Sequence, residues 1–211
     1  MITSLQVVTP PASEPVSVAL ARKHCRVDHP DDDDLLGIYI TAARTWAESY
    51  TGRAIVPRQL RWTVANERPA GAWPYVGVGA NLFILPQWAP QGLFVGNARS
   101  LELPVRPVLS VDEVSFGQWG REDEVLDAAT YGTDLNTGRV HFTSSFGPPN
   151  DHLSVLFTAG YGAGQAAPQA IIHGILLLTG FLYEHRGDAG GEMPPAAAAL
   201  LGMYRLTTFG G

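Results

Sequence analysis

The clearest hydrophobic pattern lies directly after an acidic run near the start of the chain. Asp31 to Asp34 are followed by apolar residues at spacings of three and four, namely Leu35, Ile38, Tyr39, Ala42, Trp46 and Tyr50. This spacing predicts an amphipathic helix that ends at Gly52, a residue suited to the left-handed position after a helix. The acidic residues would face the positive end of the helix dipole, and Asp31 is expected to cap the free amides.

A shorter helix is predicted just before this acidic run. Ser17 is a good N-cap residue, and the helix over Val18 to Cys25 would have Leu20 on one side and Lys23 on the other. Three prolines fall within residues 1–15, so this leading segment is expected to be an extended arm.

From Ala54 onward the pattern changes from helical spacing to alternation. Residues 60–64 alternate between apolar and polar side chains, which is typical of a half-buried strand. Further strands are predicted at residues 101–103, 108–116, 131–135, 139–142 and 153–158. The segment 136–138 ends in glycine and predicts a hairpin turn. Five or six short strands are therefore expected.

The C-terminal part of the chain returns to helical spacing. Pro168 marks the first turn of a predicted helix over Gln169 to His185. This helix is apolar almost all round, which indicates packing on several sides and more neighbours than one subunit supplies. A short helix is expected over Pro195 to Arg205, followed by a tail that ends at Gly211.

Together these elements predict an α+β fold, in which a helical bundle from both ends of the chain carries an inserted β-rich domain. The expected divisions are residues 1–53 for the arm and first helices, 54–164 for the β-rich domain, and 165–211 for the last helices and tail. A long loop over residues 67–100, rich in glycine, proline and tryptophan, would leave the sheet.

Composition narrows the class of protein. The chain has 211 residues, of which 45% are apolar and 16% charged, and a formal net charge of −6. These proportions are typical of a globular protein, and the negative charge gives no support to tight binding of nucleic acid through phosphates. Cys25 is the single cysteine, no charged leader precedes an apolar stretch, and no segment is apolar enough for a membrane span. A cytoplasmic protein without membrane contacts is expected.

Motifs for catalysis or metal binding are weak. The six histidines show no zinc-binding spacing, and the acidic run lacks the glycine and distal glutamate of a calcium loop. The glycines at 160, 162 and 164 stand between a strand and a helix, but their spacing completes no phosphate-binding motif. No serine lies in a nucleophile elbow. We therefore expect no cofactor, no metal and no enzymatic activity.

The aromatic residues of loop 67–100 leave one alternative open. Trp73, Tyr75, Phe83, Trp88 and Phe94 are too many for a solvated linker. They could line a site for a small molecule or a carbohydrate, which would make the protein a binding module or an enzyme. A monomer that binds a sugar would favour this alternative over an assembly protein.

Several segments, taken in order, resemble the head–tail connector (adaptor) family of long-tailed double-stranded DNA phages and gene transfer agents. The resemblance covers most of the chain and is carried by residues 15–17, 26–28 with the acidic run, 42–53, 158–162, 168–186 and 200–205. In two respects the chain departs from the family. Leu20 stands where a glutamate would complete a capping box after Ser17, and the loop 67–100 is longer than expected.

The resemblance implies a structural role. Such a protein would form a homo-oligomeric ring of twelve copies between the portal and the stopper or tail-terminator protein, and double-stranded DNA would pass through the ring without specific binding. It would be located in the neck of a virion or phage-like particle, assembled in the cytoplasm of the bacterial host. A negative chain suits a channel through which DNA must slide.

Three groups of residues are the candidates for these contacts. The tail offers Arg205, Leu206 and Phe209 for docking to the portal, a partner that the resemblance implies. The apolar helix offers Ile175, Leu177, Leu178 and Phe181 for the contact between subunits. The acidic run offers Asp31, Asp32 and Asp33 as residues that face the channel.

Overall fold

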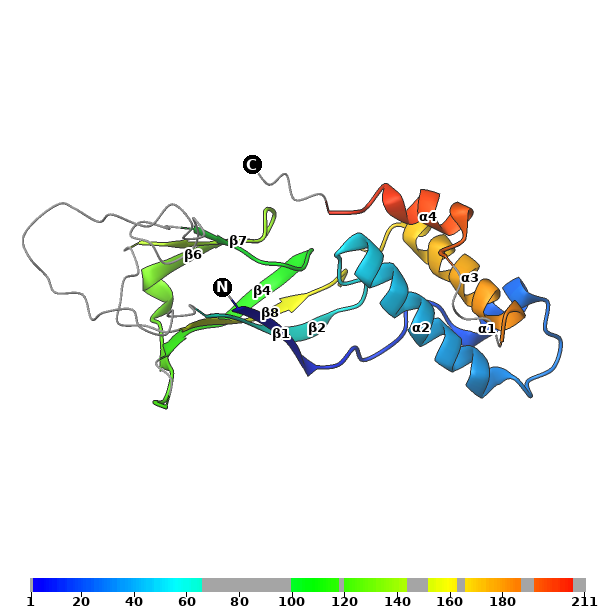
Figure 1. Ribbon diagram of the computed structural model, residues 1–211, viewed down its shortest axis with the longest axis horizontal. Helices are drawn as coiled ribbons and strands as arrows, with labels where there is room; N and C mark the ends of the chain where they lie inside the picture. The colour runs from blue at the N-terminus through cyan, green and yellow to red at the C-terminus, as the bar shows by residue number, and fades with distance from the viewer. Residues whose placement is uncertain are drawn as a thin grey trace, which may run out of the picture. The chain divides into compact units, whose positions relative to one another are not determined.

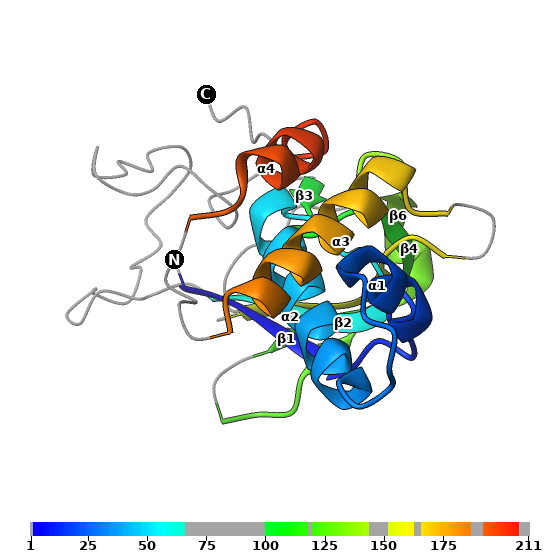
Figure 2. The same ribbon diagram turned by 90° about the vertical axis from the view of Figure 1, so that its right-hand side faces the viewer.

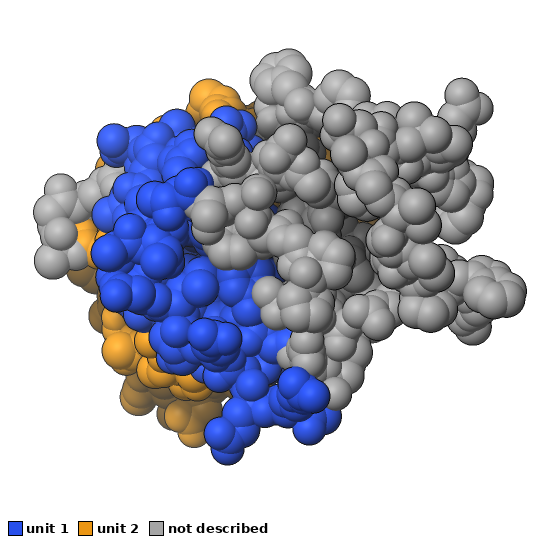
Figure 3. All heavy atoms as spheres, turned by 90° about the vertical axis from the view of Figure 1, so that its left-hand side faces the viewer, with its two compact units in different colours: residues 1–6, 61–103, 111–157 blue, residues 7–60, 104–110, 158–211 orange. Residues whose placement is uncertain are grey.

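A computed structural model describes residues 2–65, 100–117, 120–143, 152–162, 166–186 and 192–206. The chain divides into two compact units, which Figure 3 colours separately. Unit 1 comprises residues 1–6, 61–103 and 111–157, and unit 2 comprises residues 7–60, 104–110 and 158–211. Helices and sheets occur together, which confirms the predicted α+β class. The loop predicted over residues 67–100 lies, apart from Ser100, outside the described residues.

All four α-helices of the described chain belong to unit 2. Their bounds are Val18–Cys25 for α1, Asp33–Thr51 for α2, Gln169–Glu184 for α3 and Pro195–Gly202 for α4. Ser17 caps α1, because its Oγ accepts a hydrogen bond from the Leu20 amide at 3.2 Å. Gly52 ends α2 in the left-handed conformation, with φ of 70°. The predictions for the start of α1 and the end of α2 are therefore confirmed. Helix α4 ends at Gly202, three residues before the predicted end at Arg205.

Helix α3 is the centre of unit 2. It contacts α1, α2 and α4, and Figure 2 shows it lying among them. Close contact with α4 is possible because α3 has glycine at position 174, where a Cβ would lie 2.9 Å from the Leu201 side chain. The apolar character of α3 thus finds several neighbours within one subunit.

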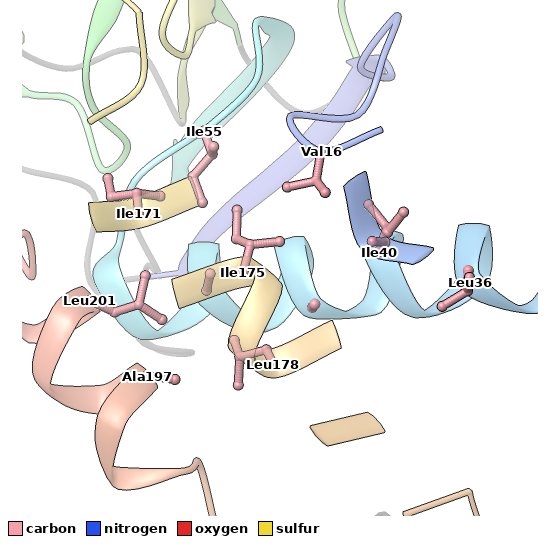
Figure 4. Close-up of a cluster of buried hydrophobic side chains, with 12 residues drawn as sticks. Val16, Leu36, Ile40, Ile55, Ile171, Ile175, Leu178, Ala197 and Leu201 are labelled. Atoms are coloured by element: carbon pink, nitrogen blue, oxygen red, sulfur yellow. The ribbon is translucent and has the colours of Figure 1, made fainter. Parts of the chain in front are cut away.

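The core of unit 2 fills the space between these helices. Figure 4 shows Ile175 and Leu178 of α3 gathered with Leu201 of α4 and Ile40 of α2. The four side chains are at most 1% exposed. Such burial is the main favourable contribution to folding, at roughly 1.5–3 kcal/mol for each large aliphatic side chain.

Two residues of α2 that the apolar spacing predicted to be buried are exposed. Ile38 is 64% exposed and Ala42 is also exposed, although both belong to the predicted apolar stripe. The residues that α2 buries are Leu36, Ile40, Ala43, Arg44, Ala47, Glu48 and Thr51. Two of them are charged and three are small, so the large apolar residues alone did not indicate the buried side.

Eight strands of the described chain form two sheets. The strand bounds are Ile2–Thr9 for β1, Arg58–Ala65 for β2, Ser100–Glu102 for β3, Val108–Gly117 for β4, Glu124–Val125 for β5, Tyr131–Asp134 for β6, Arg139–Phe142 for β7 and His152–Ala159 for β8. The larger sheet has the order β1-β2-β8-β4-β5, and the smaller has the order β3-β7-β6. The predicted arm is therefore wrong for residues 2–9, which form an edge strand.

The smaller sheet contains the predicted hairpin. Strands β6 and β7 pair antiparallel, with Tyr131 opposite Phe142 and Asp134 opposite Arg139 (Figure 1). Gly138 takes the expected left-handed conformation, with φ of 63°. Within unit 1 the two sheets meet through aromatic side chains, because the ring centroids of Phe116 on β4 and Phe142 on β7 are 6.5 Å apart.

Backbone hydrogen bonds join three segments of unit 2 that are distant in the sequence. The Ala54 amide donates to the Arg106 carbonyl at 2.9 Å, and the Gly160 amide donates to the Pro107 carbonyl at the same distance. Gly160 has φ of 136°, and a Cβ there would lie 2.5 Å from backbone atoms of Val56 and Pro57. Only glycine fits this position without displacing the neighbouring backbone.

We expect Gly160→Ala to lower the free energy of unfolding. Strained backbone at such a φ costs about 1–3 kcal/mol, before any movement of the Val56–Pro57 segment. Gly37→Ala is the opposite control, since Gly37 lies inside α2 with open space where its Cβ would be. It should raise the free energy of unfolding by about 0.4–1 kcal/mol. Urea denaturation followed by circular dichroism measures both, and equal effects of the two substitutions would contradict this account.

Candidate interaction surfaces

The four interface candidates on α3 differ in burial. Ile175 and Leu178 are fully buried in the core of their own subunit, so their side chains are not available to a neighbour. Leu177 and Phe181 remain half-exposed. The Phe181 ring packs 6.4 Å from Trp46 on α2 and 4.5 Å from His185, measured between centroids. The exposed side of α3 therefore offers Leu177 and Phe181 alone among the four.

Asp32, at the start of α2, is the acceptor of a compact polar cluster. The Tyr183 hydroxyl donates to Asp32 Oδ2 at 2.6 Å, and Arg186 Nη2 donates to the same oxygen at 2.8 Å. The guanidinium of Arg186 also lies 4.4 Å from the centre of the Tyr183 ring. The hydrogen bond from Tyr183, followed by that from Arg186, lowers the pKa of Asp32, and the same bond raises the pKa of Tyr183. This cluster ties the start of α2 to the end of α3.

The other two acidic candidates differ from Asp32 and from each other. Asp33 Oδ1 lies 2.9 Å from Arg22 Nε, which joins α2 to α1. The Asp31 side chain is 84% exposed, and its Oδ2 lies 3.7 Å from Nδ1 of His29. Asp31 does not cap the helix as predicted, because the N-cap residue is Asp32, whose side chain makes no capping hydrogen bond. Of the three, only Asp31 has its carboxylate largely in solvent.

The segment after α4 is attached to the end of α2. The Leu206 amide donates to the Thr51 carbonyl at 2.8 Å, and Arg53 Nε donates to the Tyr204 carbonyl at 2.6 Å. Leu206 is half-buried beside Gly52, and Arg205 lies 5.3 Å from the ring centre of Tyr50. Phe209, the third tail candidate, lies outside the described residues. The chain is therefore attached to its own subunit as far as Leu206.

A buried ionic network within unit 2 was not predicted from the sequence. Glu48 Oε2 accepts from Arg44 at 2.8 Å and from Arg58 at 2.6 Å, while its Oε1 accepts from the Ile55 amide at 2.8 Å. Arg44 also donates to both carboxylate oxygens of Glu14, at 2.7 and 3.1 Å. The Arg44 and Glu48 side chains are only 8% and 6% exposed.

This network holds the segment before α1 and the start of β2 against α2. Burial by itself lowers the pKa of Arg44, but the carboxylates of Glu14 and Glu48 outweigh burial, and the pKa is raised. The signal in the sequence was the pair Arg44 and Glu48, four residues apart on the side of the helix that also carries Ile40 and Ala47. Charged residues at core positions indicate a buried pair.

The described residues contain no cluster of three potential metal ligands, and none of their helices combines the length and apolarity of a membrane span. Partial burial raises the pKa of the Cys25 thiol, which makes it a poor nucleophile. Gly160 serves the close backbone approach described above. The aromatic side chains on which the alternative of a sugar or small-molecule site depends lie outside the described residues.

Comparison with known proteins agrees with the resemblance seen in the sequence. Residues 16–71 match the family model described as phage gp6-like head-tail connector protein. This segment contains α1, α2 and the whole of β2. A search of curated proteins finds no match.

Solved structures match over nearly the whole chain. One is described as the neck of an empty gene transfer agent particle with C6 symmetry, with a TM-score of 0.69, 23% identity, and coverage of 99% of this chain and 98% of the other. A chain of the virion of a native gene transfer agent particle matches with a TM-score of 0.70 and 23% identity, and the match covers 98% of each chain. The neck of a native particle with C12 symmetry matches with a TM-score of 0.66 and 22% identity, and the match covers 100% of this chain and 99% of the other.

These matches show the fold. The chain has the fold of a protein found in the neck of gene transfer agent particles, and its first helices match a head–tail connector model. The resemblance stated from the sequence is therefore confirmed, in sequence over residues 16–71 and in fold over almost the full length.

Proposed function

We propose that this chain is a structural head–tail connector, which forms a ring in the neck of a phage or gene transfer agent particle. The observation that carries the proposal is the likeness to chains of gene transfer agent necks over at least 98% of both chains, together with the connector match at residues 16–71. Binding surfaces, and not catalytic residues, perform this function. The ring lies between the portal and the stopper or tail-terminator protein.

Ring formation by about twelve copies is supported by the C12 symmetry of one related neck. Of the four interface candidates on α3, Leu177 and Phe181 are half-exposed and can be contacted by a neighbouring subunit. The ionic network and the Asp32 cluster stabilise the helices of each subunit, so that every copy presents the same surface. A rigid surface lowers the entropic cost of association.

Passage of DNA requires a channel that does not hold phosphates. The chain carries a net charge of −6, so a ring of these chains repels DNA when its charges face the lumen. Asp31 is the channel-facing residue that we propose from the acidic run, because Asp32 and Asp33 are bound to residues of their own subunit.

The portal contact is assigned to the residues after Leu206, with Phe209 as the apolar anchor. Burying a phenylalanine side chain in a groove contributes roughly 1.5–3 kcal/mol before ordering costs. Repetition of this weak contact around a ring produces a stable joint.

Truncation after Leu206 tests this assignment. The shortened chain retains the bonds of Tyr204 and Leu206 to the end of α2, so its circular dichroism spectrum and melting temperature should be unchanged. It should fail to attach to DNA-filled heads, which would leave tail-less particles visible by electron microscopy. The substitution Phe209→Ala should also weaken attachment of the chain to DNA-filled heads.

Two results would contradict parts of this proposal. Normal attachment of the truncated chain would show that the portal contact lies elsewhere on the subunit. Failure of the intact chain to bind heads purified from cells that lack it would contradict the connector function itself.

A further inference from the structure

The outward side of α2 combines an exposed apolar side chain with acidic residues. Ile38 is 64% exposed, and Asp34, one turn before it, is also exposed. Thr41 and Thr45 continue this side of the helix. The basic residue of α2, Arg44, is buried in the ionic network. We call Asp34, Ile38, Thr41 and Thr45 the α2 face.

The outward side of α1 has the opposite charge. Leu20 is 42% exposed, and the exposed Lys23 lies one turn after it. The expectation that these two residues lie on opposite sides of the helix is therefore wrong, because residues three apart share one face. Helix α1 contains no acidic residue, and its last turn contains Arg22, Lys23 and His24. Arg22 is engaged with Asp33, whereas Lys23 forms no ion pair with another described residue. We call Leu20 and Lys23 the α1 face.

The two faces match when the helices are placed antiparallel. Leu20 and Lys23 are three residues apart, and Ile38 and Asp34 are four apart, which corresponds to roughly 4.5 and 6 Å along a helix. Leu20 would then lie beside Ile38 while Lys23 lies beside Asp34. The same arrangement puts the negative C-terminal end of α1 next to the positive N-terminal end of α2, which is favourable for the helix dipoles.

We propose that the α1 face of one copy of this chain packs against the α2 face of the next copy in the ring. The inference rests on the proposed connector function and names a subunit contact within it. Because the two faces differ, the contact is head-to-tail, and contacts of that kind form a ring when the rotation from one copy to the next closes on itself. Charge complementarity favours a second copy as the partner, since each chain supplies both the cationic and the acidic face.

Charge reversal on one face at a time provides the test. One variant carries Leu20→Glu and Lys23→Glu, and the other carries Asp34→Lys and Ile38→Lys. Each full-length variant, added alone to purified heads that lack this chain, would bring like charges together at every contact. We expect association between copies to weaken at least about tenfold, with few complete rings in electron micrographs.

Mixing the two variants in equal amounts should restore the rings. Copies that alternate around the ring again place an acidic face against a basic face at every contact, and a ring of twelve allows strict alternation. A chain with all four substitutions should also form rings by itself. Circular dichroism melting of each variant checks that the subunits are folded, which is expected because all four side chains are at least partly exposed.

Val125→Lys with Leu135→Glu is the matched control, since these apolar residues are 59% and 40% exposed in unit 1. This variant should form normal rings. The inference is overturned if either α1-face or α2-face variant assembles alone as well as the unaltered chain, if mixing restores nothing, or if mixing yields only dimers. In each of these cases ring formation by the unaltered chain would still uphold the connector function.

Discussion

Replacing Ile175 with aspartate is expected to prevent the chain from folding. Ile175 of α3 is fully buried in the core that α3 shares with α2 and α4. Loss of its packing costs about 2–5 kcal/mol, and burial of an unpaired carboxylate adds several kcal/mol more. A typical domain has only about 5–15 kcal/mol of stability in total. Soluble expression and the circular dichroism spectrum of the purified chain measure the effect.

Two matched variants separate core packing from assembly. Leu177→Asp places the same carboxylate two residues away, at a half-exposed position, so the subunit should fold but form fewer rings. Ile175→Val keeps the site apolar and should cost only about 0.5–1.5 kcal/mol. A folded Ile175→Asp subunit that failed only in assembly would show that this residue belongs to the subunit interface.

The second large effect is expected from Glu48→Ala. This change removes the carboxylate that pairs with both Arg44 and Arg58, and it leaves the buried Ile55 amide without its acceptor. Removing one member of a buried charge pair costs about 3–5 kcal/mol. For a chain of this size that corresponds to a fall in melting temperature of roughly 6–20 °C, measurable by calorimetry.

Ser49→Ala is the control for this experiment, because Ser49 is the next residue of the same helix and is exposed. Its effect should stay within about 0.5 kcal/mol, so the control separates loss of the network from the introduction of alanine into this turn of α2. Glu48→Gln should fall between the two, since the amide oxygen can still accept from Ile55 while the negative charge is lost. Equal melting temperatures for Glu48→Ala and Ser49→Ala would mean that the network does not stabilise the subunit.

The helices were predictable from the sequence because their signals are local. Ser17 and Gly52 act at helix ends through their own side chain or backbone conformation, and α1 has the predicted bounds. The hairpin at Gly138 is local in the same sense. Strand β1 was missed because residues 2–9 do not alternate strictly, and their strand depends on pairing with β2, a distant part of the chain.

The surfaces were harder to predict than the fold. Ile38 fits the helical spacing of the apolar residues, yet it lies outside the core because the buried side of α2 is the one that carries Ile40, Arg44 and Glu48. Leu206 was predicted to belong to a tail that docks on a partner, because nothing in the neighbouring sequence indicates its bond to Thr51, which is distant in the sequence. Contacts of long sequence separation leave no periodic signal in a single sequence.

The attachment of Leu206 also sets a length limit on the docking that we propose for the tail. Three residues of fully extended chain span at most about 11 Å, which is the greatest distance that the chain allows between the Cα atoms of residues 206 and 209. Since Leu206 is bonded to Thr51, this distance is measured from the last turn of α2. A groove that accepts Phe209 must therefore approach the subunit at this helix end, and lengthening the tether with inserted glycines between Leu206 and Phe209 would enlarge the region that the anchor can search.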